Sequence, residues 1–364
     1  MVGIHDVARR AGVSPITVSR VVNNRTGVRA ATRQRVLDAI AELSYIPNAV
    51  ARGLKQARSG MLALIITDIT SPFFTDVARG AEDAARGAGL SLVLGNSEED
   101  PALEAEYLRV MGERRIDGVV LVPTNQAVDA ISRSLPSGVP VVLFDRDVPG
   151  LDADVVCCDT HAGTQALCRY LLALGHRRIA IVGGLPTVET WHERVGGYEA
   201  ALQEAGIAVS PELEVPGDYK GTGGAAAVRA LLGQGTAPDA IIAANAQVAL
   251  GVLDALVAAG YRTPEDIVVA SIDDPLPRST FWPRLTVVEQ PGYDMGKTAV
   301  ELLIGRLTGN DRAAPPRKVV FEATLLVGST SDGVDQPVPG LTGDGVGATD
   351  GRMGGKKRPI ASSR

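Results

Sequence analysis

Residues 4–23 read IHDVARRAGVSPITVSRVVN, and this stretch predicts two short helices joined by a tight turn. Apolar residues recur at helical spacing as far as Ala11, and Gly12 is typical of the position just after a helix. Ser14 followed by Pro15 is an N-cap and first-turn signal for the second helix. A third amphipathic run follows at residues 31–43. Helix, tight turn, helix and supporting helix is the helix-turn-helix arrangement.

Formal charge divides the chain into two unequal parts. Residues 1–58 contain nine arginines and one lysine against three acidic residues, which gives a charge of +7. Because the whole chain carries −6, the remaining 306 residues carry −13. A basic segment attached to an acidic body is typical of a nucleic-acid-binding module joined to a domain with another task. A merely solvated basic face is the alternative.

Composition excludes several classes of protein. A length of 364 residues indicates about two or three domains. No apolar run approaches the roughly 18 residues of a membrane span, and the N-terminus MVGIHDVARR lacks a secretory leader. The cysteines at 157, 158 and 168 form neither an even framework nor a CxxC pair, so we expect reduced thiols and a cytoplasmic location.

From Met61 onward, short apolar runs alternate with amphipathic helical stretches. The predicted strands are 62–66, 92–94, 118–122, 139–143, 179–182, 240–243 and 267–271, with helices between them. Such alternation predicts parallel sheets with right-handed crossovers, and the length predicts two similar lobes. We therefore expect an α/β fold in which a helix-turn-helix head precedes a two-lobed core of doubly wound parallel sheets. Residues 331–364 are rich in Gly, Pro and Asp, which predicts a disordered tail.

Catalytic and cofactor motifs are missing from this pattern. The glycines of residues 221–224 begin a predicted helix without the spacing of a dinucleotide-binding fingerprint. The sequence contains no nucleophile elbow, no P-loop and no His/Cys spacing of a metal site. Asp273 and Asp274 are adjacent carboxylates without an evident acid–base partner. We expect no enzymatic activity, no cofactor and no metal.

The pattern Asp6-Val7-Ala8-x-x-Ala11-Gly12-Val13-Ser14-x-x-Thr17-Val18-Ser19-Arg20-Val21-x-Asn23 closely resembles the DNA-binding head of the LacI/GalR (lactose-repressor) family. The match continues to residue 54. The resemblance implies base contacts from the second helix, where Arg20 can donate to guanine and Ile16 can contact a thymine methyl. It implies a hinge helix at 47–55 whose leucine enters the minor groove. The implied DNA-binding residues are Pro15, Ile16, Thr17, Ser19, Arg20, Asn23, Arg29, Arg33, Asn48 and Leu54.

The body of the chain resembles the sugar-binding core of the same family, which is itself similar to ribose-type periplasmic binding proteins. Polar and aromatic residues follow the predicted strands, where open α/β sheets bind ligands. Aromatic rings would cover the faces of a sugar, and charged groups would bind its hydroxyls. The implied effector-binding residues are Ser71, Phe73, Phe74, Asp145, Arg146, Arg194, Tyr219, Asn245, Asp273 and Gln290.

Alternative interpretations of these residues remain open. An adjacent Asp–Arg is often an ion pair, and two adjacent phenylalanines are often core. Ala246 stands where relatives carry Asp, so we expect a helix-capping carboxylate to be missing there. Trp191 and Trp282 are further candidates for the pocket wall.

The resemblance implies a cytoplasmic transcription regulator that a small sugar, a ribose-like pentose or a hexose, releases from a pseudo-palindromic DNA operator. We expect a homodimer, with a tetramer as the alternative, and no membrane partner. A purine-like co-repressor and, in another class, a sugar-binding transport protein are alternatives. The expected parts are a head at 1–46, a hinge at 47–58, a core at 59–330 and a tail at 331–364. The first lobe would comprise 59–158 and 291–318, and the second 159–290 and 319–330.

Overall fold

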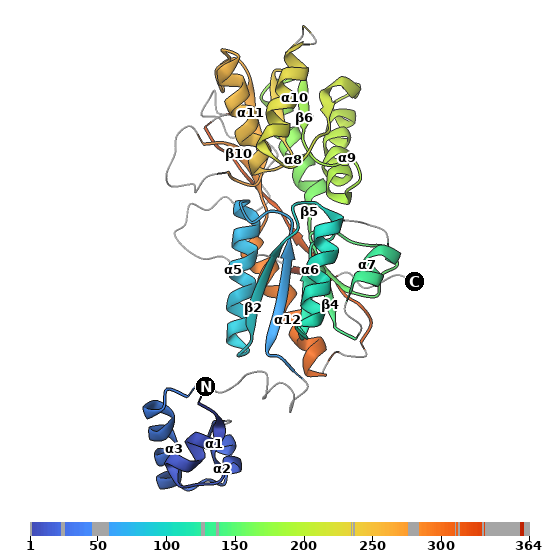
Figure 1. Cartoon of the computed structure of the whole chain (residues 1–364). Coiled ribbons are helices and arrows are strands. Elements are labelled where there is room, and N and C mark those ends of the chain that lie inside the picture. Colours follow the sequence, from blue (N-terminus) through green and yellow to red (C-terminus); the bar gives the residue numbers. More distant parts are fainter. Residues whose placement is uncertain are drawn as a thin grey trace. The chain divides into compact units, whose positions relative to one another are not determined.

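The computed structural model describes residues 2–22, 26–45, 58–124, 128–135, 138–233, 235, 237–275, 284–309, 311, 314–329, 331 and 357–359 (Figure 1). The chain forms two compact units, Met1–Ser59 and Gly60–Arg364, and each is considered by itself. The predicted hinge at 47–58 lies outside the described residues except for Arg58, as does the predicted tail except for residues 331 and 357–359.

The first unit is the predicted helix-turn-helix. Its helices are α1 (Ile4–Ala11), α2 (Pro15–Val22) and α3 (Ala30–Glu42). Gly12 ends α1 in the left-handed region with φ 65°, and Ser14 Oγ accepts a hydrogen bond from Thr17 N at 3.2 Å at the start of α2. Buried apolar side chains from all three helices form one small core, which fixes the face that α2 leaves exposed.

The second unit contains two sheets, one in each of two lobes. The first lobe has the strand order β13-β11-β5-β4-β3-β1-β2. Only β13 is antiparallel to its neighbour. The strands are β1 (Met61–Ile66), β2 (Ser91–Asn96), β3 (Gly118–Leu121), β4 (Val141–Phe144), β5 (Asp154–Asp159), β11 (Lys318–Glu322) and β13 (Lys357–Pro359). Helices α5 (Pro72–Gly87) and α12 (Gly292–Thr308) pack on one face, and α6 (Pro101–Glu113) and α7 (Val128–Ser134) on the other.

The second lobe repeats this architecture with the order β12-β10-β9-β8-β6-β7. Its strands are β6 (Ile179–Val182), β7 (Glu214–Val215), β8 (Ala240–Ala243), β9 (Val268–Ile272), β10 (Thr286–Glu289) and the antiparallel β12 (Thr324–Leu326). Its helices are α8 (Thr160–Ala173), α9 (Glu189–Glu204), α10 (Gly221–Gly233) and α11 (Ala246–Ala258), with the short 3-10 helix η1 (Pro211–Leu213) before β7. The α/β fold with a helix-turn-helix head and two parallel sheets is confirmed.

The chain crosses between the lobes at three described points: from β5 into α8, from β10 into α12, and from β11 into β12. The expected boundary at 318/319 is wrong, because Lys318–Glu322 pairs in parallel with β5 in the first sheet. The Phe321 side chain is fully buried in the core of the first lobe, which fixes this strand there. The last crossing therefore lies at Ala323.

Helices of each lobe approach one another so closely that only glycine fits at the contacts. A Cβ on Gly251 of α11 would lie 1.8 Å from Gly221 O of α10, and one on Gly80 of α5 would lie 2.0 Å from Tyr293 O of α12. A Cβ on Gly197 of α9 would lie 2.2 Å from His161 O of α8. These helix pairs carry the residues that surround the junction of the lobes, so their packing positions it.

Replacing Gly251 by Ala should lower the free energy of unfolding of the core unit by about 3 kcal/mol, the upper end of the usual range for overpacking. The new methyl group meets backbone rather than a movable side chain. Thermal unfolding of the purified protein measures this change. Gly87→Ala, at the end of α5 with nothing within 4 Å of the new Cβ, is the matched control. It should leave the melting temperature unchanged or slightly raised, since Ala favours a helix by up to about 1 kcal/mol over Gly. Equal effects of the two substitutions would contradict the close-packing argument.

Candidate functional site

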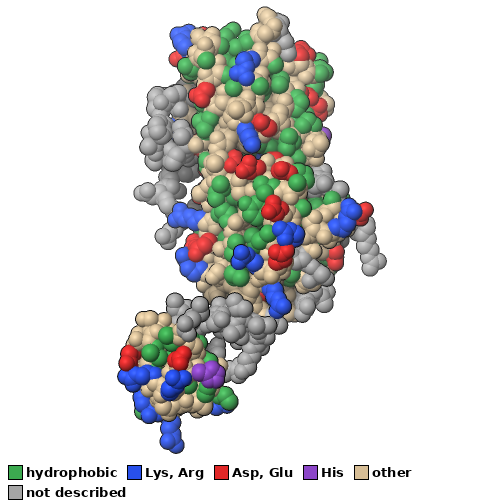
Figure 2. All heavy atoms as spheres, in the orientation of Figure 1, with side chains coloured by type: hydrophobic (Ala, Val, Ile, Leu, Met, Phe, Trp, Pro, Cys, Tyr) green, Lys and Arg blue, Asp and Glu red, His purple; other side chains and the backbone are tan. Residues whose placement is uncertain are grey.

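Helix α2 presents a mixed apolar and basic surface. Ile16 is 69% exposed, and Arg20 is also exposed, whereas Val18 and Val21 on the opposite side are buried in the head core. Figure 2 shows Lys and Arg side chains gathered over this unit. An exposed aliphatic side chain and a guanidinium on one helix can contact a thymine methyl and a guanine edge.

The other predicted DNA contacts are distributed around this helix. Pro15, Thr17 and Ser19 lie on α2, Arg29 precedes α3 and is exposed, and Arg33 lies half-buried on α3. Three predicted residues lie outside the described residues: Asn23, Asn48 and Leu54. The minor-groove role of Leu54 therefore stays a prediction.

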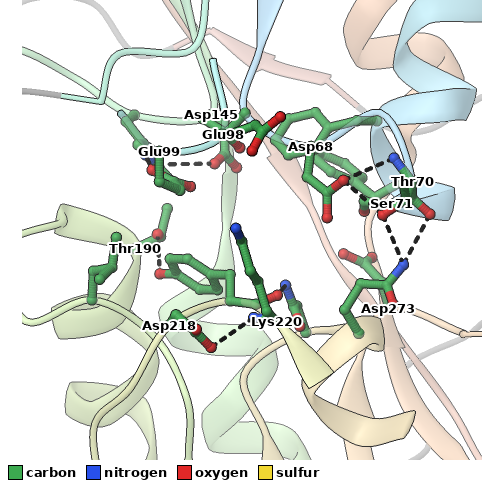
Figure 3. Close-up of a pocket in the computed structure, with 18 of the residues that line it drawn as sticks. Asp68, Thr70, Ser71, Glu98, Glu99, Asp145, Thr190, Asp218, Lys220 and Asp273 are labelled. Carbon is green, nitrogen blue, oxygen red and sulfur yellow. Dashed lines mark hydrogen bonds and ion pairs between the residues drawn. The ribbon is translucent and has the colours of Figure 1, made fainter. Parts of the chain in front are cut away.

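A cavity of about 500 Å³ lies at the junction of the two lobes, at the carboxyl ends of the strands (Figure 3). All ten predicted effector-binding residues line it. They are Ser71, Phe73, Phe74, Asp145 and Arg146 from the first lobe, and Arg194, Tyr219, Asn245, Asp273 and Gln290 from the second lobe and its crossing. This placement matches the general position of ligand sites in open α/β sheets.

One carboxylate from each lobe occupies an equivalent position. Asp145 follows β4 and Asp273 follows β9, and both adopt the left-handed conformation, with φ 66° and 60°. Asp145 N donates to Val156 O and Asp273 N donates to Val288 O, each at 2.8 Å across to the neighbouring strand. For a non-glycine residue this backbone conformation costs about 1–3 kcal/mol and persists only where the surrounding structure enforces it. Such residues cluster at functional sites.

Two guanidinium groups lie on the ring of Tyr219. The Cζ atoms of Arg146 and Arg194 are 5.7 and 5.8 Å from the ring centroid, within cation–π range. Arg146 is held by a bidentate pair with Glu99 at 2.5 and 2.7 Å, so its main partner is not the adjacent Asp145. Arg194 Nη1 donates to Ala244 O at 2.7 Å. The Tyr219 hydroxyl shares a 2.9 Å hydrogen bond with Thr190 Oγ1, which fixes the ring.

Burial shifts the acid–base behaviour of these groups. Desolvation raises the pKa of Asp273 from 3.8 to about 6, against the opposing hydrogen bonds from Gln290 N and Nε2 at 3.1 and 2.8 Å. Desolvation also raises the pKa of Asp145, although the nearby Arg146 and Arg194 favour its charged form. Burial opposes the charge of Arg146, but its contacts with Glu99 raise its pKa, so it stays protonated.

Several polar atoms of this cavity lack a hydrogen-bond partner within the described structure. They are Arg146 Nε, Arg194 Nε and Gln290 Oε1, all buried. Arg146 Nε lies 3.6 Å from Asp145 Oδ2, beyond hydrogen-bond distance. Buried polar atoms are normally paired, and an unpaired one costs about 1–3 kcal/mol. Two donors and an acceptor left open beside two carboxylates fit a ligand whose groups both donate and accept.

The alternatives for individual residues resolve in different ways. Phe73 and Phe74 line the cavity and also belong to the core of the first lobe. Their contact with an effector stays a prediction. Arg194 is on α9 rather than at a strand end, and its length brings it back to the cavity. Trp191 packs in the core of the second lobe and is absent from the cavity lining. Trp282 lies outside the described residues.

Asn245 supplies the helix cap that Ala246 cannot. Its Oδ1 accepts a hydrogen bond from Val248 N at 2.8 Å, and its Nδ2 donates to Tyr219 O at 3.0 Å. The capping that we expected to be missing is therefore provided by the preceding residue. The same side chain ties α11 to the aromatic wall of the cavity.

Sequence reasoning missed about half of the cavity wall. The missed residues lie at the end of β2, in loops after β1, β2, β6 and β7, and at the starts of α9, α10 and α11. Their positions after strands were the signal that could have identified most of them. They are Thr67, Asp68, Thr70, Asn96, Glu98, Glu99, Leu185, Thr190, Asp218, Lys220, Gly221 and Gln247. Lys220 and several of these carboxylates appear around the opening in Figure 3.

Among the described residues, no cluster of three or more His, Cys, Asp or Glu side chains is arranged to hold a metal ion. Within the same described part, no helix is long and apolar enough to span a membrane.

The chain matches two family models. "Periplasmic binding proteins and sugar binding domain of LacI family" matches residues 59–323, and "Bacterial regulatory proteins, lacI family" matches residues 3–48. The regulator RegA of Clostridium saccharobutylicum is 35% identical, covering 89% of this chain and 97% of RegA. The ribose operon repressor of Escherichia coli K12 is 36% identical, covering 85% and 94%.

A solved lac repressor dimer, bound to its operator and the anti-inducer ONPF, is 28% identical with a TM-score of 0.79. The alignment covers 91% of this chain and 99% of that one. The matches extend over both units, so the head and the core belong to the same kind of regulator rather than to a transport protein or an enzyme. The chain belongs to the LacI family of bacterial regulatory proteins and is a DNA-binding transcription regulator with a sugar-binding type of core.

Proposed function

We propose that this regulator is a repressor that binds a pseudo-palindromic operator as a homodimer and is released by a small uncharged sugar, with D-ribose as the first candidate. The observation that carries the proposal is the set of buried, unpaired donors and acceptors in the cavity. Hydroxyl groups of a polyol can accept from the Nε atoms of Arg146 and Arg194 and donate to Gln290 Oε1. The likeness to a ribose operon repressor supports the choice of sugar.

The aromatic residues support the same class of ligand. Phe73 and Phe74 come from the first lobe and Tyr219 from the second, and all three line the cavity. Rings on both lobes can cover the C–H faces of a sugar while the carboxylates of Asp145 and Asp273 accept its hydroxyl protons. A sugar held in this way contacts both lobes, so it favours the arrangement in which they lie close together.

In the proposed mechanism, a change in the relation of the lobes reaches DNA through the segment 47–58. We propose that this segment is a hinge that orders on the operator and that ligand binding weakens this ordering. Two heads are needed to read a pseudo-palindrome, since each recognition helix enters one major groove about one helical turn from the other. Because the operator is DNA of the bacterial cytoplasm, the proposed site of action is cytoplasmic.

Arg20→Ala should lower specific operator affinity by about 1–3 kcal/mol while non-specific DNA binding persists. The physical reason is the loss of a bidentate contact to a base, whereas phosphate contacts from other residues remain. Titrations on operator and random DNA at one fixed salt concentration measure the two affinities. Arg86→Ala is a matched control, because Arg86 is an exposed arginine of the core unit paired with Glu82 and Asp83. Equal losses on operator and random DNA would reject base reading by Arg20.

Arg194→Ala should weaken sugar binding by about 2–3 kcal/mol, roughly a hundredfold, because a buried charged donor is lost. Operator binding without sugar should remain, since the head is untouched. Calorimetry with D-ribose, other pentoses, hexoses and purine bases identifies the ligand and measures the loss. Arg169→Ala, which removes an exposed arginine paired with Glu204 on the second lobe, is the control. If a purine binds and no sugar does, the co-repressor alternative is correct.

Lowering the pH from about 7.5 to about 5 should weaken sugar binding by up to about tenfold through Asp273. With a pKa of about 6, Asp273 protonates over this range and loses acceptor capacity. Sugar hydroxyls that donate to the carboxylate favour its ionised form, so binding should release protons near pH 6. Calorimetry in buffers of different ionisation enthalpy measures this release. The isosteric Asp273→Asn protein should bind with little proton release, and unchanged release would exclude Asp273 as its source.

A further inference from the structure

A hydrogen bond joins the two lobes at the rim of the cavity. Gln247 Nε2, on the first turn of α11 in the second lobe, donates to Thr70 O at 2.9 Å in the loop after β1 of the first lobe (Figure 3). Thr70 Oγ1 is a second, longer partner at 3.3 Å. Both residues line the cavity, but sequence reasoning assigned no role to either. The contact spans the opening and is independent of the three chain crossings.

The acceptor loop is fixed within the first lobe. Thr70 N and Oγ1 both donate to Asp68 Oδ1, at 2.8 and 2.7 Å. Ile69 N donates to Asn96 Oδ1 at 2.9 Å, and Thr75 Oγ1 donates to Ser71 O at 3.0 Å. The carbonyl that receives Gln247 is therefore held in place by its own lobe, so a movement of the lobe moves it directly.

The donor is fixed equally firmly within the second lobe. Gln247 lies two residues after Asn245, whose side chain caps α11 and donates to Tyr219 O at 3.0 Å. Tyr219 is in turn bound to Thr190 through its hydroxyl. Because the backbone at both ends is held, the Gln247–Thr70 bond forms only when the lobes lie close together.

A second hydrogen bond joins another pair of loops. Asp147 N, after β4 in the first lobe, donates to Glu189 Oε2 at the start of α9 in the second lobe, at 2.8 Å. Glu189 and Asp147 are outside the cavity lining. This contact lies away from the cavity, whereas the Gln247 contact lies on the rim through which a ligand passes.

We propose that Gln247 is a positioning residue for effector retention: its hydrogen bond to Thr70 closes the rim of the cavity and slows the escape of a bound sugar. This role rests on the proposed function in that it assumes a ligand in the cavity. Because the bond joins the two lobes, it also favours their closed arrangement before a sugar binds. When only a fraction of the protein is in the binding-competent state, the apparent affinity for its ligand is reduced by that fraction.

Gln247→Ala removes the donor and leaves α11 intact, since Ala is a strong helix former. The dissociation rate of D-ribose, measured by stopped-flow on the full chain, should rise about three- to tenfold, as expected for the net loss of one neutral hydrogen bond. Gln247→Glu should raise the rate at least as much, because a carboxylate cannot donate to the Thr70 carbonyl. Gln165→Ala is the matched control: Gln165 Nε2 donates to Glu204 at the same 2.9 Å but within one lobe. It should leave the rate unchanged.

Hydrogen exchange of the ligand-free full chain provides a readout that needs no sugar. Loss of the contact should speed exchange in the peptides that contain residues 67–75 and 245–251, whereas Gln165→Ala should not. If exchange rises as expected but D-ribose does not bind the wild-type protein, the rim contact is supported and the choice of sugar is wrong. If Gln247→Ala folds with an unchanged melting temperature and alters neither exchange nor dissociation, the positioning role is overturned.

Discussion

Charge buried at the junction of the two lobes is the constraint on which the core depends. Asp145, Asp273, Arg146 and Arg194 are each at most 9% exposed, and they come from both lobes. Burying an ion is costly unless it is paired and hydrogen-bonded. Glu99 provides that partner for Arg146, and Ala244 O provides a neutral acceptor for Arg194. The partners that these charges require therefore determine where the surrounding loops and helix starts lie, and this placement determines the shape of the cavity.

The compensation is incomplete, and the proposed sugar binding depends on this. The raised pKa of Asp273 means that burial destabilises its carboxylate more than the hydrogen bonds from Gln290 stabilise it. The unpaired Nε atoms of both arginines show the same deficit on the donor side. An apolar lining of equal volume would give a more stable core but would lose the ability to bind a polyol strongly. The core is thus less stable than it could be at the site where, in the proposed mechanism, a sugar must bind the open and closed arrangements of the lobes with different affinities.

The sequence contained enough information to predict the head and most of the cavity. Val18 and Val21 determine which side of α2 faces the head core, so the exposed positions of Ile16 and Arg20 follow from helical spacing alone. The ten predicted cavity residues were found because they follow short buried strands or match the family pattern. Glu99, Thr190 and Gln247 could not be found in this way, because their roles depend on which distant residue each one meets.

The placement of β11 shows another limit of sequence reasoning. Its five residues, KVVFE, are an acceptable strand for either lobe, and only the pairing with β5 and the burial of Phe321 in the core of the first lobe decide between them. A crossing point between two similar sheets is defined by packing partners that lie far away in the chain. Periodicity locates such a strand but does not assign it to a sheet.

The three chain crossings also determine what kind of motion the core can make. Three chain segments that join two rigid lobes resist sliding of one lobe past the other, because such a displacement would have to stretch all three segments at once. The same segments allow the lobes to rotate about a shared hinge axis far more easily. The displacement that a small rotation produces grows with the distance from that axis. A ligand that shifts the rim by a fraction of an ångström can therefore produce a larger displacement at the far end of the lobe, where Gly60 and Met61 begin the core.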